Sequence, residues 1–475
     1  MEAYQEINLL NSPGWQALSN FLRQHQQEWA EHMPDLERFE HELHTRVLAL
    51  EREVLVTELA RYDVLAEQVR VKGVVCGQAL TAPETYLTTA GPVTVVRHLY
   101  RPAGYNTRHV CPLELQAGIV AGYFTPAAAR QAAYVTAHLP PRLGAELFEE
   151  LGGQHPSASS LERLPKNLSA RWEAHRAEWE AQLRTLEPVP TEAVTLAVAL
   201  DGVMAPMRAG PERAADKQPK GPQGYQEVGC GTVSLYDAQG ERLQTVRYAR
   251  QPEKSKLTLR GQLQAEVQAL LVLAPRLHVV KLSDGAPAHW DYLARLDLGR
   301  PSAPVVNWDI VDFYHACDHL HHALILVWGE CTPKGRAEFE RLKTILKEAD
   351  DGAEQVIRHL AYRRRNARGT QAAGLAKELR YFRNQRQRMR YATYLRHHLP
   401  IASGVVEAAC KTLVTQRLKQ SGMRWSPTGA QAILTLRSII QSHRWAAAWD
   451  LLRHSYQQSV QLVSVSAYAA LPLAA

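Results

Sequence analysis

The spacing of hydrophobic and polar residues changes along the chain, and each change predicts a different kind of structure. Residues 15 to 62 carry apolar side chains at helical spacing, with few helix breakers among them. The clearest series is Leu36, Phe39, Leu43, Val47 and Leu50. Pro34 interrupts the pattern, because proline lacks the amide hydrogen that a helix interior needs. We therefore predict a mainly helical N-terminal region of two helices that ends near Asp63.

Short β-like runs follow these helices. Val71 to Val75 and Val93 to Tyr100 are rich in β-branched residues, and Gly91-Pro92 marks a turn before the second run. Helical spacing returns at Pro126. The sequence therefore predicts a β-hairpin followed by helices.

Residues 143 to 172 have the pattern of two helices joined by the turn Gly152-Gly153, with Ser157 or Ser159 as the cap of the second helix. This is the arrangement of a helix-turn-helix, whose second helix can enter the DNA major groove. Any two helices joined by a glycine turn would show the same pattern. The segment is therefore either a DNA-binding helix-turn-helix or an ordinary pair of helices. Residues 187 to 190, Glu-Pro-Val-Pro, are typical of a linker.

After the linker, three apolar runs of strand length follow one another, and further such runs then alternate with helical segments. The predicted strands are Val194–Leu200, Val228–Tyr236, Arg242–Tyr248, Leu277–Leu282 and Val305–Ile310. The turn Asp237 to Gly240 joins the second and third of these strands, and Leu259–Leu273 is an amphipathic helix. A further helix carries His315 to His322. This order predicts an α/β fold with a mixed sheet covered by helices.

Composition restricts the class of protein. The chain has 475 residues, 45% of them hydrophobic and 22% charged, which are values of ordinary globular proteins and indicate several domains. The first residues do not form a secretory signal, and no run of roughly 20 apolar residues could span a bilayer. The six cysteines are scattered without a CxxC pair, so we expect reduced thiols in a cytoplasmic protein.

The formal net charge of +7 is unevenly distributed. Residues 1 to 60 contain 11 acidic and 4 basic residues, whereas residues 334 to 396 contain 17 Lys and Arg against 7 Asp and Glu. Arginine clusters on helices bind phosphate backbones well, although a solvated helix face would have a similar composition. The candidate DNA-binding residues of this stretch are Arg363, Arg364, Arg365, Arg368, Arg383, Arg386, Arg388 and Arg390.

Two predicted strands end in Asp-Gly, at Asp201-Gly202 and Asp284-Gly285. Either pair alone is explained at least as well by a simple turn of the chain. On neighbouring strands, however, the two carboxylates could share a divalent cation such as Mg²⁺, which prefers hard oxygen ligands. A candidate third acid is Glu407, in the first turn of a helix that opens at Ser403-Gly404 and continues with Lys411. An ordinary glutamate at a helix start would have the same pattern.

Together, Asp201, Asp284 and Glu407 resemble the triad of DDE transposases with an RNase H-like core. Such cores carry the first Asp on the first strand, the second Asp after the fourth strand and the Glu on a later helix. The sequence looks closest to the ISKra family of bacterial insertion-sequence transposases, within the Mutator-like superfamily. The segments that carry this resemblance are ALDGVMAP, KLSDGAPAHW, WDIVDFYHACDHL, SGVVEAACKTLVTQRLKQSGMRW and TGAQAILTLRS, followed by Trp445 and Trp449; it extends from about Val194 to Leu452.

The resemblance implies a bacterial, nucleoid-associated enzyme that cuts DNA at transposon ends and joins these ends to target DNA. It implies that Asp201, Asp284 and Glu407 bind two Mg²⁺ ions, which Mn²⁺ could replace, and that the basic stretch is a helical insertion in the core. Its expected partners are terminal inverted repeats, target DNA and further copies of the chain, as a dimer or a larger oligomer. A domesticated DNA-binding protein, an RNase H-like nuclease and a different mixed α/β enzyme remain alternatives.

Further residues acquire expected roles from the resemblance. Those expected near DNA phosphates are Lys411, Arg417, Lys419 and Arg424. Trp425 would either stack on a displaced base or pack in the core. Asp312, His315 and His319 would lie beside the active site, where the histidines would either approach DNA or simply pack. Family members often carry a zinc-binding element after a Tyr-Arg motif, but only His109 and Cys111 occur there, so we predict no structural zinc.

The predicted domains follow from these patterns. Residues 1–70 form the helical region, 71–190 the hairpin and helix-turn-helix-like region that binds DNA, 191–330 and 401–452 the two parts of the core, 331–400 the basic insertion and 453–475 a tail.

Overall fold

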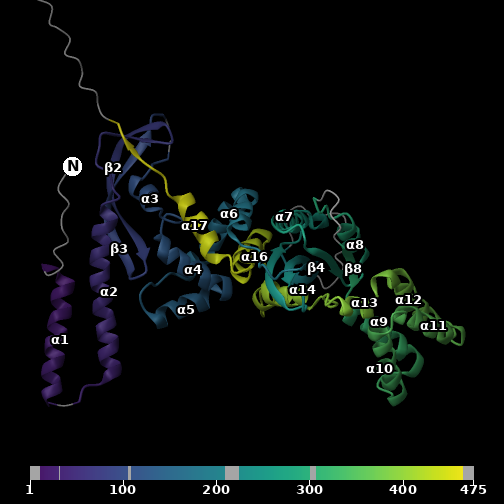
Figure 1. Ribbon diagram of the computed structural model, residues 1–475. Helices are drawn as coiled ribbons and strands as arrows, with labels where there is room; N and C mark the ends of the chain where they lie inside the picture. Colours follow the sequence, from purple (N-terminus) through teal and green to yellow (C-terminus); the bar gives the residue numbers. More distant parts are fainter. Residues whose placement is uncertain (1–10, 32, 105–107, 209–223, 300–305, 464–475) are drawn as a thin grey trace, which may run out of the picture. The chain divides into compact units, whose positions relative to one another are not determined.

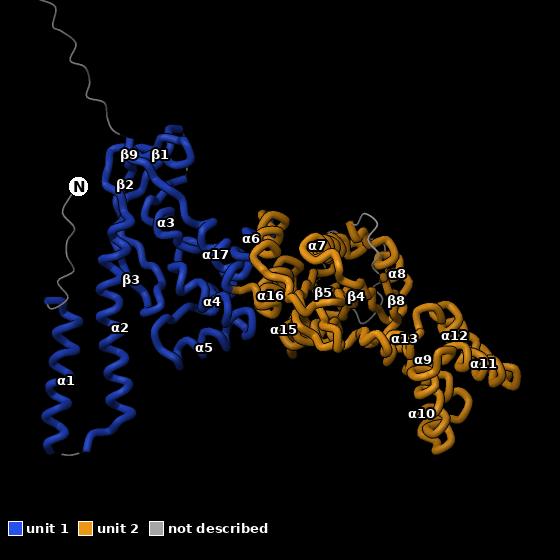
Figure 2. Tube along the Cα trace, in the orientation of Figure 1, with its two compact units in different colours: residues 1–174, 446–475 blue, residues 175–445 orange. Residues whose placement is uncertain are grey.

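The computed structural model describes residues 11–31, 33–104, 108–208, 224–299 and 306–463. The chain divides into two compact units, one made of residues 1–174 and 446–475 and the other of residues 175–445 (Figure 2). No helix within the described ranges is long and apolar enough to cross a membrane.

The first unit begins with two helices, α1 (Pro13–Glu31) and α2 (Leu36–Ala60). They flank Pro34, where the sequence predicted a break. Asp35 caps α2, because its carboxylate accepts hydrogen bonds from the amides of Glu37 and Arg38. The two helices pack against each other, with the ring of His25 stacked on that of Phe39 at 4.1 Å.

A four-stranded sheet of order β3-β2-β1-β9 follows these helices. Its strands are β1 (Gln68–Val71), β2 (Val74–Thr88), β3 (Gly91–Pro102) and β9 (Gln461–Leu462). The predicted strand Val71 to Val75 is wrong: Lys72 and Gly73 have φ of 48° and 80° and form the tight turn between β1 and β2. Most of β2 was not predicted, because much of this strand is exposed and polar and lacks a clear alternation.

Helices complete the first unit. They are α3 (Pro112–Ala117), α4 (Pro126–His138), α5 (Pro141–Leu151), α6 (Ala158–Leu186) and α17 (Trp445–Tyr456). The cap of α6 is Ser157, whose hydroxyl accepts a hydrogen bond from the Ser160 amide at 3.1 Å. Nearly all of α17 belongs to this unit, although the sequence placed it in the core. The second half of α6 belongs to the other unit.

The second unit is built on a five-stranded mixed sheet of order β6-β5-β4-β7-β8. Figure 1 labels two of these strands, β4 and β8. Its strands are β4 (Thr195–Pro206), β5 (Tyr225–Tyr236), β6 (Arg242–Arg250), β7 (His278–Ser283) and β8 (Asn307–Val311). β4, β5 and β6 pair antiparallel, whereas β4, β7 and β8 pair parallel. Each of the five strands overlaps a predicted run, although β4 extends beyond its predicted end and Val305, the start of the last run, lies outside the described residues. The mixed α/β class is therefore confirmed.

Helices cover both faces of this sheet. On one face, Gly229 and Gly231 of β5 face leucines of α7 (Leu257–Leu273) so closely that a Cβ at Gly231 would collide with Leu263. Cys230, between the two glycines, faces Cys410, which follows α14 (Gly404–Ala409). Because successive residues of a strand point to opposite faces, α7 and α14 lie on opposite sides of the sheet.

The edge strand β6 is covered by α16 (Pro427–Gln441) and the residue after it. The amides of Ala249 and Arg247 donate hydrogen bonds to the hydroxyls of Ser438 and Ser442 at 3.1 Å and 2.8 Å. These bonds occupy donors that an open edge would leave for another strand.

The basic stretch is helical, as predicted. After α8 (Pro287–Ala294) and α9 (Phe313–Trp328), it forms α10 (Pro333–Glu348), α11 (Gly352–Arg365), α12 (Gly369–Gln385), a short 3₁₀ turn (Arg386–Arg388) and α13 (Tyr391–Arg396). α10 and α12 pack against α9. Their buried residues, among them Leu346, Leu379 and Phe382, belong to the same hydrophobic core as the sheet. The insertion is therefore not a separate domain.

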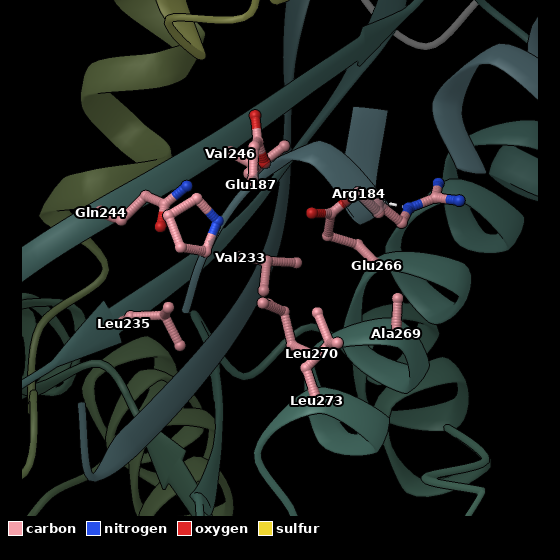
Figure 3. Close-up of a pocket in the computed structure, with 11 residues that line it drawn as sticks. Arg184, Glu187, Val233, Leu235, Gln244, Val246, Glu266, Ala269, Leu270 and Leu273 are labelled. Carbon is pink, nitrogen blue, oxygen red and sulfur yellow. Dashed lines mark hydrogen bonds and ion pairs between the residues drawn. The ribbon is translucent and has the colours of Figure 1, made fainter. Parts of the chain in front are cut away.

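A buried ion-pair cluster joins α6, α7 and the end of α16 in the second unit. Glu266 of α7 is bonded by Arg184 at 2.9 Å and by Arg444 at 2.6 Å, and it accepts a hydrogen bond from Tyr248 at 2.6 Å. Arg444 also pairs with Glu187 at 2.6 Å. Arg184, Glu187 and Glu266 line a small pocket with an apolar floor that includes Val233, Leu235 and Leu270 (Figure 3).

Burial alone would raise the pKa of Glu266, but Arg444, Arg184 and Tyr248 lower it below its usual range. The cluster therefore contributes its full stability above about pH 4.3, the ordinary pKa of a glutamate, and this stability is lost as the pH falls through the lowered pKa.

Removal of Arg444 tests this cluster. We expect Arg444→Met to lower the free energy of opening of β6 and α7 by about 3–5 kcal/mol, because it leaves Glu187 and the buried Glu266 undercompensated. Native-state hydrogen exchange measures this opening. The control is Arg396→Met, which breaks the exposed pair with Asp350 and should cost less than about 1 kcal/mol. Equal effects of the two variants would contradict the assignment.

Candidate active site

Asp201 lies within β4, and the prediction that the strand ends at Asp201-Gly202 is wrong. β4 continues to Pro206, paired with β5 throughout, and Asp201 is the register partner of Cys230. The extension is possible because Gly202 and Gly229 face each other, and a Cβ at Gly202 would collide with the carboxylate of Glu227. One oxygen of Asp201, Oδ1, accepts a hydrogen bond from the Gly202 amide at 2.7 Å.

Asp284 follows β7 directly, as the sequence predicted. Its Oδ1 accepts hydrogen bonds from the Ser283 hydroxyl at 3.0 Å and the Ala286 amide at 2.9 Å, and lies 3.3 Å from Nδ1 of His289. Burial alone would raise the pKa of Asp284, but His289, the Ala286 amide and Ser283 together hold it well below its usual range. The second acid is therefore a carboxylate at neutral pH, and none of these three contacts uses its other oxygen, Oδ2.

The parallel register relates the first two acids. β4 pairs with β7 from Thr195 opposite His278 to Ala199 opposite Leu282. Continued for two residues beyond this last pair, the same offset would place Asp201 opposite Asp284. The two backbones therefore reach the same level on neighbouring strands, which lie about 4.8 Å apart in a sheet.

Glu407 lies in α14, which packs against β4 and β5. Its side chain is exposed, and its Oε1 accepts a hydrogen bond from the Ser403 hydroxyl at 2.6 Å. Three residues later, Sγ of Cys410 lies 3.5 Å from Oδ2 of Asp201. Cys230, burial and Asp201 all raise the pKa of the Cys410 thiol. The thiol therefore stays protonated and donates a hydrogen bond to Asp201. The contact brings the helix of the third acid to the strand of the first.

The chain after α14 is a π-helical turn, Cys410–Thr415, followed by α15 (Gln416–Leu418). The turn packs against β4 and contributes the buried Leu413 and Val414 to the core. Such turns contain one more residue per turn than an α-helix and are frequent at functional sites.

Asp312 links these segments, although it does not stand at the surface as an accessory group would. It is 1% exposed and caps α9, where Oδ1 accepts a hydrogen bond from the His315 amide at 2.6 Å. Oδ2 accepts a short hydrogen bond from the amide of Ser403, the residue that binds Glu407. The Asp312 amide donates to the Ser283 carbonyl at 2.9 Å, next to Asp284. A single residue thus ties the loop of the second acid to the turn that begins the helix of the third.

His315 and His319 of α9 lie against α12. Nδ1 of His319 lies 2.5 Å from a carboxylate oxygen of the buried Glu378, and its ring stacks on Tyr381 at 3.6 Å. Burial lowers the pKa of His319 despite this carboxylate. The His315 ring lies edge-on to the His319 ring at 5.1 Å. Of the two roles expected for the histidines, these contacts favour packing.

The insertion contacts the loop of the second acid, a feature that the sequence analysis missed. The Tyr381 hydroxyl donates a hydrogen bond to the Asp284 carbonyl at 3.3 Å, and the Gln385 amide donates one to the Gly285 carbonyl at 3.2 Å. Gly285 has φ of 96°, and a Cβ there would lie 2.9 Å from the Tyr381 ring. α12 therefore holds the backbone on which Asp284 stands.

The predicted DNA-binding residues divide into two groups. Those with exposed side chains are Arg364, Arg365, Arg368, Arg383, Arg386, Arg390, Lys411, Lys419 and Arg424. Arg363 is committed to an ion pair with Glu338 at 2.8 Å, and Arg388 lies over the Trp290 ring at 4.1 Å. Arg386 lies 3.8 Å from Glu354 in an exposed pair.

Arg417 was predicted to contact DNA phosphates, and the structure contradicts this. Its side chain is 1% exposed and lies over the ring of Trp425 at 5.2 Å. Burial and the nearby Arg437 lower the pKa of Arg417 to about 10. The Trp425 indole donates a hydrogen bond to the Leu418 carbonyl at 3.0 Å, which favours the packing role for this tryptophan.

The three acids have the chemistry that Mg²⁺ requires, since each offers carboxylate oxygens and has at least one oxygen bonded to a protein donor. In the described ranges, however, no three His, Cys, Asp or Glu side chains form a group that could hold a metal ion as they stand. The bond from Ser403 holds the Glu407 carboxylate toward the start of its own helix. Glu407 would have to turn away from Ser403 to join Asp201 and Asp284.

Comparisons with known proteins identify no relative by sequence. No family model and no curated protein matches the chain. Among solved structures, the chain is similar to a Drosophila P element transposase strand transfer complex, with 9% sequence identity and a TM-score of 0.25. The match covers 70% of this chain and 82% of the other. A superposition at this TM-score establishes neither a common fold nor a common function.

Asp312→Asn tests the link between the acid-bearing segments. Both carboxylate oxygens accept backbone amides, and an Asn side chain offers only one acceptor, so one amide loses its partner. We expect a loss of roughly 2–3 kcal/mol and faster hydrogen exchange at residues 401–407. Asp309→Asn, at a half-exposed position three residues earlier, is the control. Unchanged exchange at residues 401–407 would show that Asp312 does not order this turn.

Proposed function

We propose that the chain is a DNA transposase of the DDE type, related to the ISKra family, with an RNase H-like core interrupted by a basic helical insertion. One observation carries the proposal. Asp201 lies on the first strand of the mixed sheet, and Asp284 follows the fourth, which pairs parallel with the first. Glu407 lies on a later helix, and Cys410, which directly follows that helix, contacts Asp201. This is the order of acids that the resemblance implies.

In this proposal Asp201, Asp284 and Glu407 hold two Mg²⁺ ions. The ions would activate a water molecule or a DNA 3′-hydroxyl and stabilise the attacking and leaving oxygens of an in-line displacement at phosphorus. The chain's own contribution is to keep Asp284 ionised and to fix its Oδ1, so that the carboxylate is oriented before metal or DNA arrives. Asp312 and the Ser403 amide order the turn from which Glu407 approaches.

The exposed arginines of the insertion would hold the DNA. Arg364, Arg365 and Arg368 lie at the end of α11 and in the loop before α12, and they form no ion pair with any residue in the described ranges. Since α12 also binds the loop of Asp284, DNA bound along these helices would be tied to the second acid through Tyr381 and Gln385. Transposon ends and target DNA are both polyanions, and both require such a surface.

Asp284→Asn tests the catalytic proposal. With a duplex that carries the inverted repeats flanking the gene, we expect the wild-type chain to cleave in Mg²⁺ and in Mn²⁺ and to join the ends to a target plasmid. Asp284→Asn should lower cleavage by at least about 10³-fold without weakening DNA binding, because catalysis then loses a metal ligand. Asp291→Asn, an exposed acid on α8, is the matched control.

Three outcomes of this experiment would contradict the proposal in different ways. DNA binding without cleavage by the wild-type chain would indicate a domesticated DNA-binding protein. Nicked products without joined products would indicate an RNase H-like nuclease. Equal cleavage by the wild-type chain and Asp284→Asn would remove Asp284 from the site.

Replacement of Arg364, Arg365 and Arg368 by Gln tests the DNA surface. We expect weaker binding to all duplexes, with the slope of log affinity against log salt reduced by about 0.9 for each phosphate that the variant no longer neutralises. The control replaces three exposed arginines of the N-terminal region, Arg23, Arg38 and Arg61, and changes the net charge equally. If both triple variants weaken binding to the same extent, only net charge matters and the surface is wrongly placed.

A further inference from the structure

Lys256 contacts the strand that carries the first acid and a histidine beside the second acid, although nothing in the sequence pattern singled it out. It is the last residue of the short 3₁₀ turn Lys254–Lys256, which precedes α7. Its Nζ donates hydrogen bonds to the Asp201 carbonyl at 3.3 Å and to Oε1 of Glu227 at 2.9 Å, and it lies 3.1 Å from Nε2 of His289. The side chain is 13% exposed.

The backbone at this point is unfavourable for a lysine. Ser255 and Lys256 have φ of 57° and 52°, in the left-handed region that residues with a Cβ rarely adopt and glycine adopts freely. Strained backbone of this kind tends to occur at functional sites, where the surrounding contacts hold it. The three polar contacts of the Lys256 side chain therefore stabilise a backbone conformation that is otherwise unfavourable.

His289 continues the contact to the second acid. It is buried on α8, and its Nδ1 lies 3.3 Å from Oδ1 of Asp284 and 3.4 Å from the Ser283 hydroxyl. A lysine ammonium only donates hydrogen bonds, so Nε2 of His289 accepts from Lys256. The other ring nitrogen, Nδ1, faces the Asp284 carboxylate.

We propose that Lys256 and His289 are positioning residues that hold the Asp284 carboxylate in a fixed orientation relative to the strand of Asp201. The chain of contacts is Asp201 carbonyl, Lys256 Nζ, His289 and Asp284 Oδ1. Lys256 fixes the position of His289, and His289 orients Oδ1 so that Oδ2 remains for a cation. Histidines and their partners around metal ligands act in this way in many sites. The inference rests on the proposed function, since it assumes that Asp284 binds a divalent cation.

Glu227 distinguishes this role from a simple ion pair. Its half-exposed carboxylate lies beside Gly202 and pairs with Lys256. If the lysine served only to neutralise Glu227, then Glu227→Gln would have the same effect on metal binding as Lys256→Met. In our proposal Glu227→Gln has the smaller effect, because Lys256 keeps its contacts to His289 and Asp201.

The test is Mn²⁺ binding to the full-length chain, measured by the electron paramagnetic resonance of free Mn²⁺ and accompanied by thermal unfolding. We expect Lys256→Met and His289→Ala to bind Mn²⁺ 10–100-fold more weakly than the wild-type chain. Lys256→Gly should lose affinity to the same extent while its unfolding midpoint stays equal or rises, because glycine relieves the left-handed backbone. His289→Asn, which retains a donor near Asp284, should lose less than His289→Ala. Lys254→Met, an exposed lysine of the same turn, is the control.

The outcomes separate the inference from the proposed function. Wild-type affinity in Lys256→Met and His289→Ala, with binding abolished in Asp284→Asn, would overturn the positioning role and leave the proposed function intact. Equal losses in His289→Asn and His289→Ala, or in Glu227→Gln and Lys256→Met, would also overturn it. No Mn²⁺ binding by the wild-type chain, or equal binding by Asp284→Asn, would overturn the proposed function and the inference with it.

Discussion

The candidate site depends on one buried carboxylate, that of Asp312. Removing such a charge from water is costly unless hydrogen bonds replace the lost solvation. Here two backbone amides, those of His315 and Ser403, provide these bonds. Because the two amides lie on different segments of the chain, the need to compensate one charge fixes where both segments lie. The start of α9, the end of β7 and the turn before α14 are therefore placed together by electrostatics as much as by hydrophobic packing.

The basic insertion shares this dependence on the core. Leu379 and Phe382 of α12 are buried in the same hydrophobic cluster as the strands. Tyr381 of the same helix donates a hydrogen bond to the Asp284 carbonyl. A polar surface on α12 is thus attached to the acid through side chains that have little freedom to move. Burial raises the pKa of Tyr381, so its hydroxyl keeps the proton that it donates to the Asp284 carbonyl.

The sequence allowed the sheet of the second unit to be predicted because its strands are buried on both faces and therefore form continuous apolar runs. β2 of the first unit was missed because its exposed, polar residues do not show this pattern. Arg417 was placed at the surface because charge alone does not reveal which face of a helix is covered. Lys256 and Tyr381 could not have been predicted, since their contacts to the residues of the acids span 55 and 97 positions. Only the folded chain brings such groups together.

The cluster around Glu266 brings together the two ends of the second unit. The chain enters this unit through α6 and leaves it after Arg444, and Arg184 and Arg444 bind the same oxygen of Glu266. The entry and exit points are thus held close together by one side chain. Domains with adjacent termini tolerate transplantation into other chains and circular permutation. The second unit therefore has the adjacent chain ends that such rearrangements require.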